Sequence, residues 1–338
     1  MAGVGTRASA ADFNAIQSVI SSVMGLGTGT TGYGQGIAST AVSANSLISE
    51  TQWDNLRSDL TKARVHQTGV AVATGSTASG SPWQTLFDVT SSTVLSEAIR
   101  FQYQDFVDNG VNPNRLAVAA SQLTPNVVLS TSTRGPGANW GSPGNIAISH
   151  TITVSFGGYT SGSLTVSAAD HARCFFNAGG SIQIRASRTG TAATSKDTDW
   201  TNMLGNGTIN SGFGDFTLRA ATSTFTGSLN PVAGFTFPSS TGWATMSSNA
   251  GAPTNFITQG SSISQYAENR YTINAHKTAS TIVFVITFRD ADVGDQTGLG
   301  PAVDELVTGT ITSTCLCTSP SGSNVSVPAP TASGTAIA

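Results

Sequence analysis

The stretch IAISHTITVSF, from Ile146 to Phe156, places apolar side chains at alternate positions. His150 is the one polar residue in that apolar row. Alternation with a period of two is typical of a β-strand that turns one face to the core. This stretch therefore predicts a β-fold from residue 145 onward.

Further short segments alternate in the same way and are separated by Gly, Asn and Ser. Residues 282–286 (IVFVI) are apolar without a break, which predicts a central strand covered on both faces. The other expected strands lie at residues 164–166, 182–186, 213–218 and 271–273. This spacing predicts a mainly antiparallel β-sandwich with Greek-key or jelly-roll-like connections over residues 145–318.

Two segments near the start match each other at an offset of 40 residues. Ser9 is followed by Asp12, and Ser49 by Gln52, which is the capping-box pattern of a helix N-terminus. Both then carry an apolar stripe with helical spacing: Phe13, Ile16 and Ile20 in the first, and Trp53, Leu56 and Leu60 in the second. We therefore expect an α+β fold, with a short N-terminal helical segment (residues 1–70) before the sandwich.

A helix of this length with one apolar stripe is marginal alone and must pack on something. The candidates are the other helix or the same helix of a neighbouring subunit. We expect the stripes to form an assembly interface.

Between the two helices lies GLGTGTTGYGQG, from Gly25 to Gly36. A phosphate-binding loop needs a preceding buried strand and a Lys after its last Gly, and both are missing. A flexible connector is the better interpretation.

Two regions lack the alternating pattern. Residues 71–144 predict mixed helix and linker, with helices at 93–108 and 113–122 and a Gly/Pro/Ser-rich linker over 130–144. Residues 319–338 include VSVPAPT, whose alternate prolines predict an extended C-terminal tail.

The composition excludes several classes of protein. Of 338 residues, 10% are charged, the net charge is -3, and 37 Gly join 44 Ser and 47 Thr. The few basic residues form no run, which disfavours nucleic-acid binding, and no apolar stretch is long enough to span a membrane. The start has no apolar signal region, so we expect no secretion. So little charge favours a surface that is covered by other chains.

Metal binding is weakly indicated. Cys174, Cys315 and Cys317 lack zinc-site spacing and favour reduced structural thiols. Asp290, Asp292 and Asp295 resemble a short calcium loop, but the EF-hand Glu and flanking helices are missing, so a solvated loop is the stronger interpretation. We expect no metal and no cofactor.

Catalytic patterns are also sparse. Asp197 and Asp199 beside Trp200 are the only carboxylate pair flanked by an aromatic residue, and no G-x-S-x-G motif occurs. The run DHARCFFNAGG (residues 170–180) is the densest in functional residue types. Phe175 and Phe176 within it are expected as core or interface anchors. We expect that the protein is not an enzyme.

Three strings carry a resemblance: ISETQWDNLRSDLTKARVHQTG (residues 48–69), HARCFFNAGGSIQIRASRTG (residues 171–190) and the VPAPT terminus. They resemble virion structural proteins of tailed bacteriophages, notably the large contractile-tailed phages of marine cyanobacteria. The resemblance covers most of the chain and implies a place in a particle, without saying whether in the neck, tail, baseplate or fibre.

The expected function is a non-enzymatic phage particle component that binds copies of itself and other virion proteins. Its expected location is the virion, assembled in the host cytoplasm, without nucleic acid or membrane as a partner. The alternative is a β-sandwich that binds a receptor or host surface glycan through exposed aromatic side chains. The candidates for such contacts are Trp140, Trp200, Trp243 and Tyr266.

Overall fold

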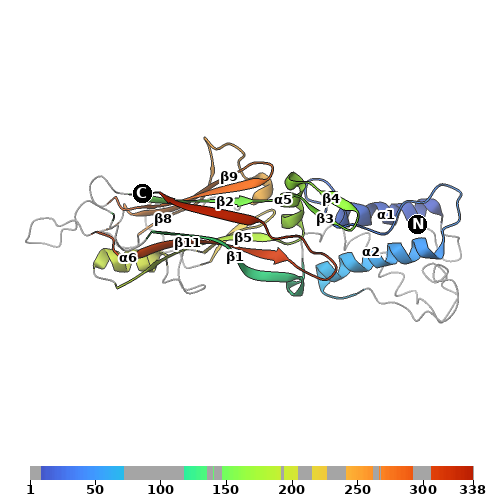
Figure 1. Cartoon of the computed structure of the whole chain (residues 1–338), viewed down its shortest axis with the longest axis horizontal. Helices are drawn as coiled ribbons and strands as arrows, with labels where there is room; N and C mark the ends of the chain where they lie inside the picture. Colours follow the sequence, from blue (N-terminus) through green and yellow to red (C-terminus); the bar gives the residue numbers. More distant parts are fainter. Residues whose placement is uncertain are drawn as a thin grey trace, which may run out of the picture. The chain divides into compact units, whose positions relative to one another are not determined.

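The computed structural model describes residues 9–71, 118–134, 140, 147–191, 194–204, 215–226, 241–261, 266, 268–291 and 306–337 (Figure 1). These residues form an α+β fold with two large antiparallel sheets in a sandwich-like arrangement and an N-terminal helix. The predicted fold class is therefore confirmed.

The chain divides into two compact units that interleave along the sequence. Unit 1 contains the described residues up to Thr124, with Gly158–Gly180 and Ser319–Ala329. Unit 2 contains Pro125–Gly157, Ser181–Thr318 and the described residues from Pro330 onward. The predicted division at residues 70, 144 and 318 differs because local patterns mark elements and do not show which distant segments pack together.

Unit 2 holds both large sheets. One has the strand order β12-β2-β10-β9-β8 and the other β1-β11-β5-β6-β7. The strands of the first sheet are β2 (Ala147–Ser155), β8 (Thr254–Gly260), β9 (Arg270–Lys277), β10 (Thr281–Arg289) and β12 (Thr331–Ile337). Those of the second are β1 (Leu123–Arg134), β5 (Ser181–Thr189), β6 (Asp215–Leu218), β7 (Ser223–Thr226) and β11 (Thr310–Pro320). Aromatic side chains join the two layers, since the Phe216 ring of β6 lies 4.8 Å from that of Phe256 on β8.

The quoted stretch is β2, whose inward row, His150 included, is buried. It pairs with β10, which also pairs with β9, so the expected central strand is confirmed as central. The expectation that β10 is covered on both faces is wrong. Burial alternates along it, and Val283 and Val285 are only half-buried.

The last strand corrects the expectation of an extended tail. β12 pairs antiparallel with β2, from Thr331 opposite Ser155 to Ile337 opposite Ser149. Gly334 faces the other sheet so closely that an added Cβ would lie 2.1 Å from the Ser132 hydroxyl of β1. The start of the predicted 130–144 linker, up to Arg134, likewise belongs to β1. Small side chains thus let the two edge strands approach each other.

Unit 1 begins with the two predicted helices, α1 (Ala10–Met24) and α2 (Glu50–Thr68). Both capping boxes are present, and Gly69 ends α2 in the left-handed conformation. Both predicted apolar stripes are buried, and the Phe13 and Trp53 rings meet edge to face at 5.1 Å. The stripes therefore pack within one chain, which corrects the expectation that they form an interface with other chains.

Unit 1 also contains η2 (Ala120–Gln122), the β3–β4 hairpin (Tyr159–Ser161 and Leu164–Val166) and helix α5 (Ala168–Asn177). The sequence patterns did not predict β3 or α5. Of the expected helix at 113–122, the described residues 118–122 are helical only at η2. The expected strand at 164–166 is β4, paired only with β3 among the described strands. The expected helix at 93–108 lies outside the described residues.

Replacing Trp53 by Ala tests the helix packing. Because Trp53 is buried against Phe13, we expect the free energy of unfolding to fall by about 3–5 kcal/mol in urea denaturation followed by circular dichroism. Leu47→Ala, at a position that is 96% exposed, is the control and should change it by less than about 0.5 kcal/mol. Equal stability of wild type and Trp53→Ala would contradict this packing.

Candidate functional site

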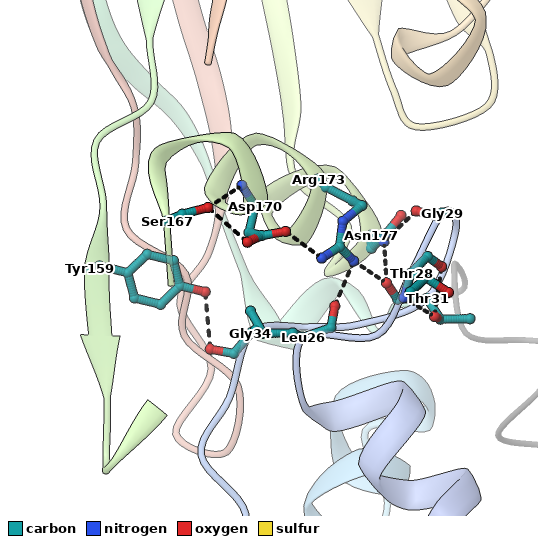
Figure 2. A network of polar contacts seen from close by, with 10 residues as sticks. All are labelled: Leu26, Thr28, Gly29, Thr31, Gly34, Tyr159, Ser167, Asp170, Arg173 and Asn177. Carbon is teal, nitrogen blue, oxygen red and sulfur yellow. Dashed lines mark hydrogen bonds and ion pairs between the residues drawn. The ribbon is translucent and has the colours of Figure 1, made fainter. Parts of the chain in front are cut away.

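Helix α5 brings together the two motifs that stood out in the sequence, the 170–180 run and the glycine-rich segment. Arg173 Nη1 donates to the carbonyl oxygens of Leu26 and Thr31, the latter at 2.7 Å. Asn177, one helical turn later, donates from Nδ2 to the same Thr31 oxygen at 2.9 Å. Figure 2 shows both side chains pointing from α5 to the loop. We call this arrangement the loop clamp.

The clamp is anchored at the start of α5. Ser167 caps the helix by accepting a hydrogen bond from the Asp170 N–H, and its hydroxyl donates to the Asp170 carboxylate at 2.7 Å. Asp170 in turn pairs with Arg173 Nη2 at 2.8 Å. Hydrogen bonds from Arg173 and Ser167 lower the pKa of the Asp170 carboxyl, which keeps the partner of the guanidinium charged.

The clamped loop is not the flexible connector that the sequence predicted. Its amides are used internally: Tyr33 N donates to Val23 O at 2.8 Å and Gln35 N to Met24 O at 2.7 Å. Gly34 has φ +65°, and a Cβ there would lie 2.1 Å from the Tyr159 hydroxyl, which donates to the Gly34 carbonyl. These amides are therefore not available to cradle a phosphate, and the loop acts as a packed element of unit 1.

The three buried thiols of the chain, together with His66 of unit 1, have a packing role. Burial raises the pKa of Cys174 to about 11, and that of Cys317 in β11 to about 11 as well. Burial raises the pKa of Cys315 as well, and all three cysteines are free thiols. Since the thiolate is the nucleophile, these residues are poorly reactive near neutral pH. His66 Nε2 lies 3.0 Å from the Ala178 carbonyl, and burial lowers its pKa to about 4.

A second polar cluster lies in unit 2 around helix α6 (Ser195–Leu204). Arg188 Nη2 and Asp197 Oδ1 are 2.8 Å apart, and neither side chain has any exposed surface. Thr308 donates to the same carboxylate from N at 2.7 Å and from Oγ1 at 2.6 Å. Asp199 accepts from Ser261 Oγ at 2.8 Å. The two carboxylates were expected on a loop and lie on a helix, where each binds a different partner.

The interpretation of residues 290–295 as a solvated loop, preferred over the weaker calcium candidate, is wrong at its first residue. Asp290 is buried and pairs with Lys196 of α6 at 3.1 Å, while Asp292 and Asp295 lie outside the described residues. Across the described ranges, no group of three His, Cys, Asp or Glu side chains could hold a metal ion.

Three of the four glycan-contact candidates are buried. Trp140 and Trp200 pack edge to face at 4.9 Å, and Tyr266 lies under the Lys196 ammonium at 5.9 Å. Trp243, in η3 (Trp243–Thr245), is half-buried beneath Lys277 Nζ at 4.4 Å. Trp140, Trp200 and Tyr266 are therefore not exposed to stack on a sugar, as the glycan-binding alternative required.

Phe175 and Phe176 are both buried in α5, with ring centroids 5.4 Å apart. Sequence reasoning missed Arg188 and Lys196, the cations of the α6 cluster. For Lys196 a signal was available in the sequence, because lysine is rare in this chain: Lys196 is one of only three. It is the second residue of α6.

Comparison with protein-family models, curated proteins and solved structures finds no match. Within the described ranges, no helix combines the length and the hydropathy needed to cross a membrane.

Replacing Arg173 by Met tests the loop clamp. Losing the two hydrogen bonds to Leu26 and Thr31 should speed hydrogen exchange of the Tyr33 and Gln35 amides about thirtyfold, since each such bond contributes about 1 kcal/mol. Arg57→Met removes a half-buried Arg–Asp ion pair of α2 that does not touch the loop, and is the control. Unchanged exchange in Arg173→Met would show that the loop keeps its conformation without the clamp.

The buried histidines predict a loss of stability in acid. Burial lowers the pKa of His66 and of His150 from 6.5 to about 4, with the Arg134 charge assisting at His150. As the pH falls, these histidines therefore take up protons in the unfolded chain before they do so in the folded chain. Their contribution to the free energy of unfolding is complete above pH 6.5 and decreases as the pH falls from 6.5 to about 4. Each histidine contributes up to about 3 kcal/mol to this fall.

His150→Gln should flatten this pH dependence in urea denaturation between pH 4 and 7, because it removes one of the two groups. Leu47→Ala, an exposed change that leaves both buried histidines in place, is the control and should keep the wild-type slope. A wild-type slope in His150→Gln would contradict the assignment.

Proposed function

We propose that this protein is a non-enzymatic structural component of a tailed-phage particle, in the neck, tail, baseplate or fibre. It assembles with copies of itself or with other virion proteins. The three sequence strings that resemble phage virion proteins support the phage setting, and the low charge of the chain supports assembly.

The observation that carries the proposal is the absence of charge on the edges of the two sheets. The four edge strands, β1, β7, β8 and β12, contain one charged residue between them, Arg134 at the end of β1. An edge strand presents unpaired N–H and C=O groups, and monomeric proteins protect it with charges, prolines or bulges. Pro125 protects the start of β1, and a bulge between Asn255 and Ile257 interrupts β8. The rest of β1, with β7 and β12, has none of these features except Arg134, and such edges are expected where other chains cover them.

β1 is the edge best suited to another chain. It is 12 residues long, and no described strand pairs with it on the side away from β11. Val128 near its middle is 62% exposed, and is one of three large apolar side chains exposed to this degree among the described residues. The buried contacts of Trp140, Trp200 and Tyr266 give the glycan-binding alternative less support.

Val128→Lys tests this proposal. If β1 pairs with the same strand of a second copy, two lysines close together repel each other, and oligomers at micromolar concentration should dissociate in light scattering. Leu47→Lys introduces the same charge at an exposed apolar residue of unit 1 and should keep the wild-type mass. If Val128 instead contacts another virion protein, Val128→Lys should be depleted from purified particles. A monomeric wild type that is also missing from particles would overturn the proposal.

A further inference from the structure

The Lys196–Asp290 contact lies in the interior of unit 2 and takes no part in the proposed assembly through the sheet edges. Lys196 Nζ of α6 lies 3.1 Å from Asp290 Oδ2, directly after the end of β10. Neither side chain has any exposed surface. Removing two charges from water carries a desolvation penalty, which their mutual attraction offsets only in part.

The surroundings of this pair are aromatic. The Tyr266 ring lies 5.9 Å from Lys196 Nζ. Trp200, four residues after Lys196 and so on the same side of the helix, packs on Phe288 at 6.3 Å. Phe288 precedes Asp290 by two residues. Such neighbours exclude water, and transfer of one proton from Nζ to Oδ2 across the contact gives a neutral amine and a neutral acid side by side.

A third carboxylate belongs to the same region. Asp199 lies one helical turn after Lys196, is buried, and accepts from Ser261 at the end of β8. Gly260, the residue before Ser261, pairs with Arg270 at the start of β9. Asn269, the residue before Arg270, accepts a hydrogen bond from the Ala291 N–H at 3.1 Å. Ala291 follows Asp290. Helix α6, the β8–β9 end and the end of β10 therefore converge here.

Asn269 also supplies a donor. It is fully buried, and its Nδ2 has no hydrogen-bond partner among the described residues. Its Oδ1 is held beside Asp290 by the bond from Ala291 N. Nδ2 does not hydrogen-bond Asp290 in this structure, so the bond that the amide would donate must form during the reaction, as negative charge develops on the carboxyl oxygen.

From this geometry we propose that Lys196 and Asp290 form an intramolecular isopeptide bond. The neutral Nζ attacks the Asp290 side-chain carbonyl carbon and gives a tetrahedral intermediate. The carbon–hydroxyl bond then breaks, and the hydroxyl leaves with a proton from Nζ as one molecule of water. Asp199 carries that proton as general base and acid, and Asn269 Nδ2 binds the carbonyl oxygen. The reaction changes no oxidation state and needs no cofactor.

The bond would fix α6 to the end of β10 across a long loop of chain. A cross-link of this kind stabilises a fold mainly by restricting the unfolded chain, and more so for longer loops. The neighbouring Arg188–Asp197 pair, equally buried, has no amine nucleophile and keeps its ionic form. This inference does not depend on the proposed phage role.

Mass spectrometry of the whole denatured chain tests the bond. The wild type should be lighter than its sequence by one water, and protease digestion should release one branched peptide that joins Lys196 to Asp290. Lys196→Met should restore the full sequence mass. Lys277→Met, which replaces a lysine of β9, is the matched control and should keep the water loss.

Two further variants separate this bond from other losses of water. Asp290→Asn should lose ammonia in place of water and give the same cross-linked product as the wild type. Asp199→Asn should form the bond more slowly, with the uncross-linked mass in freshly made protein. A wild type with its full sequence mass would overturn the proposal, as would a water loss that survives in Lys196→Met.

Discussion

Antiparallel pairing between β2 and β10 is the interaction on which unit 2 depends. The register runs from Thr281 opposite Ser155 to Arg289 opposite Ala147, and it aligns the apolar rows of the two strands on one face. β12 then adds to the free side of β2, and β9 to that of β10. A slip of one residue would turn the buried rows outward, so the same pairing determines both the core and the position of the edges.

The chain has few charged residues, and unit 2 buries several of them. Arg188 with Asp197 and Lys196 with Asp290 are fully buried pairs, and Arg185 with Asp215 is nearly so. These pairs hold α6 and the neighbouring strands in place, and none of their side chains adds charge to the surface. What remains outside is a sandwich whose edge strands are rich in Ser and Thr, a surface that repels other chains weakly.

Local patterns predicted the elements that depend on local physics. The period of β2 and the capping boxes of α1 and α2 lie within a few consecutive residues, and the sequence revealed them. β12 was missed because small residues, Ala332, Gly334 and Ala336, take the alternate positions where a strand pattern needs large apolar ones. Gly334 is small because Ser132 of β1 lies close to it in the folded chain. The stripes of α1 and α2 showed which side is buried, without showing that the partner is the other helix. The loop clamp joins Thr31 to a side chain 142 residues away, which no local pattern contains.

We propose that sheet edges with almost no charge make this protein a building block of a particle. An electron-microscopy map of purified particles, at a resolution that separates strands, tests it most directly. We expect density for this chain in the neck, tail, baseplate or fibre, with β1 covered by a strand of a neighbouring chain. Particles without this chain, or density in which all four edge strands face solvent, would contradict it.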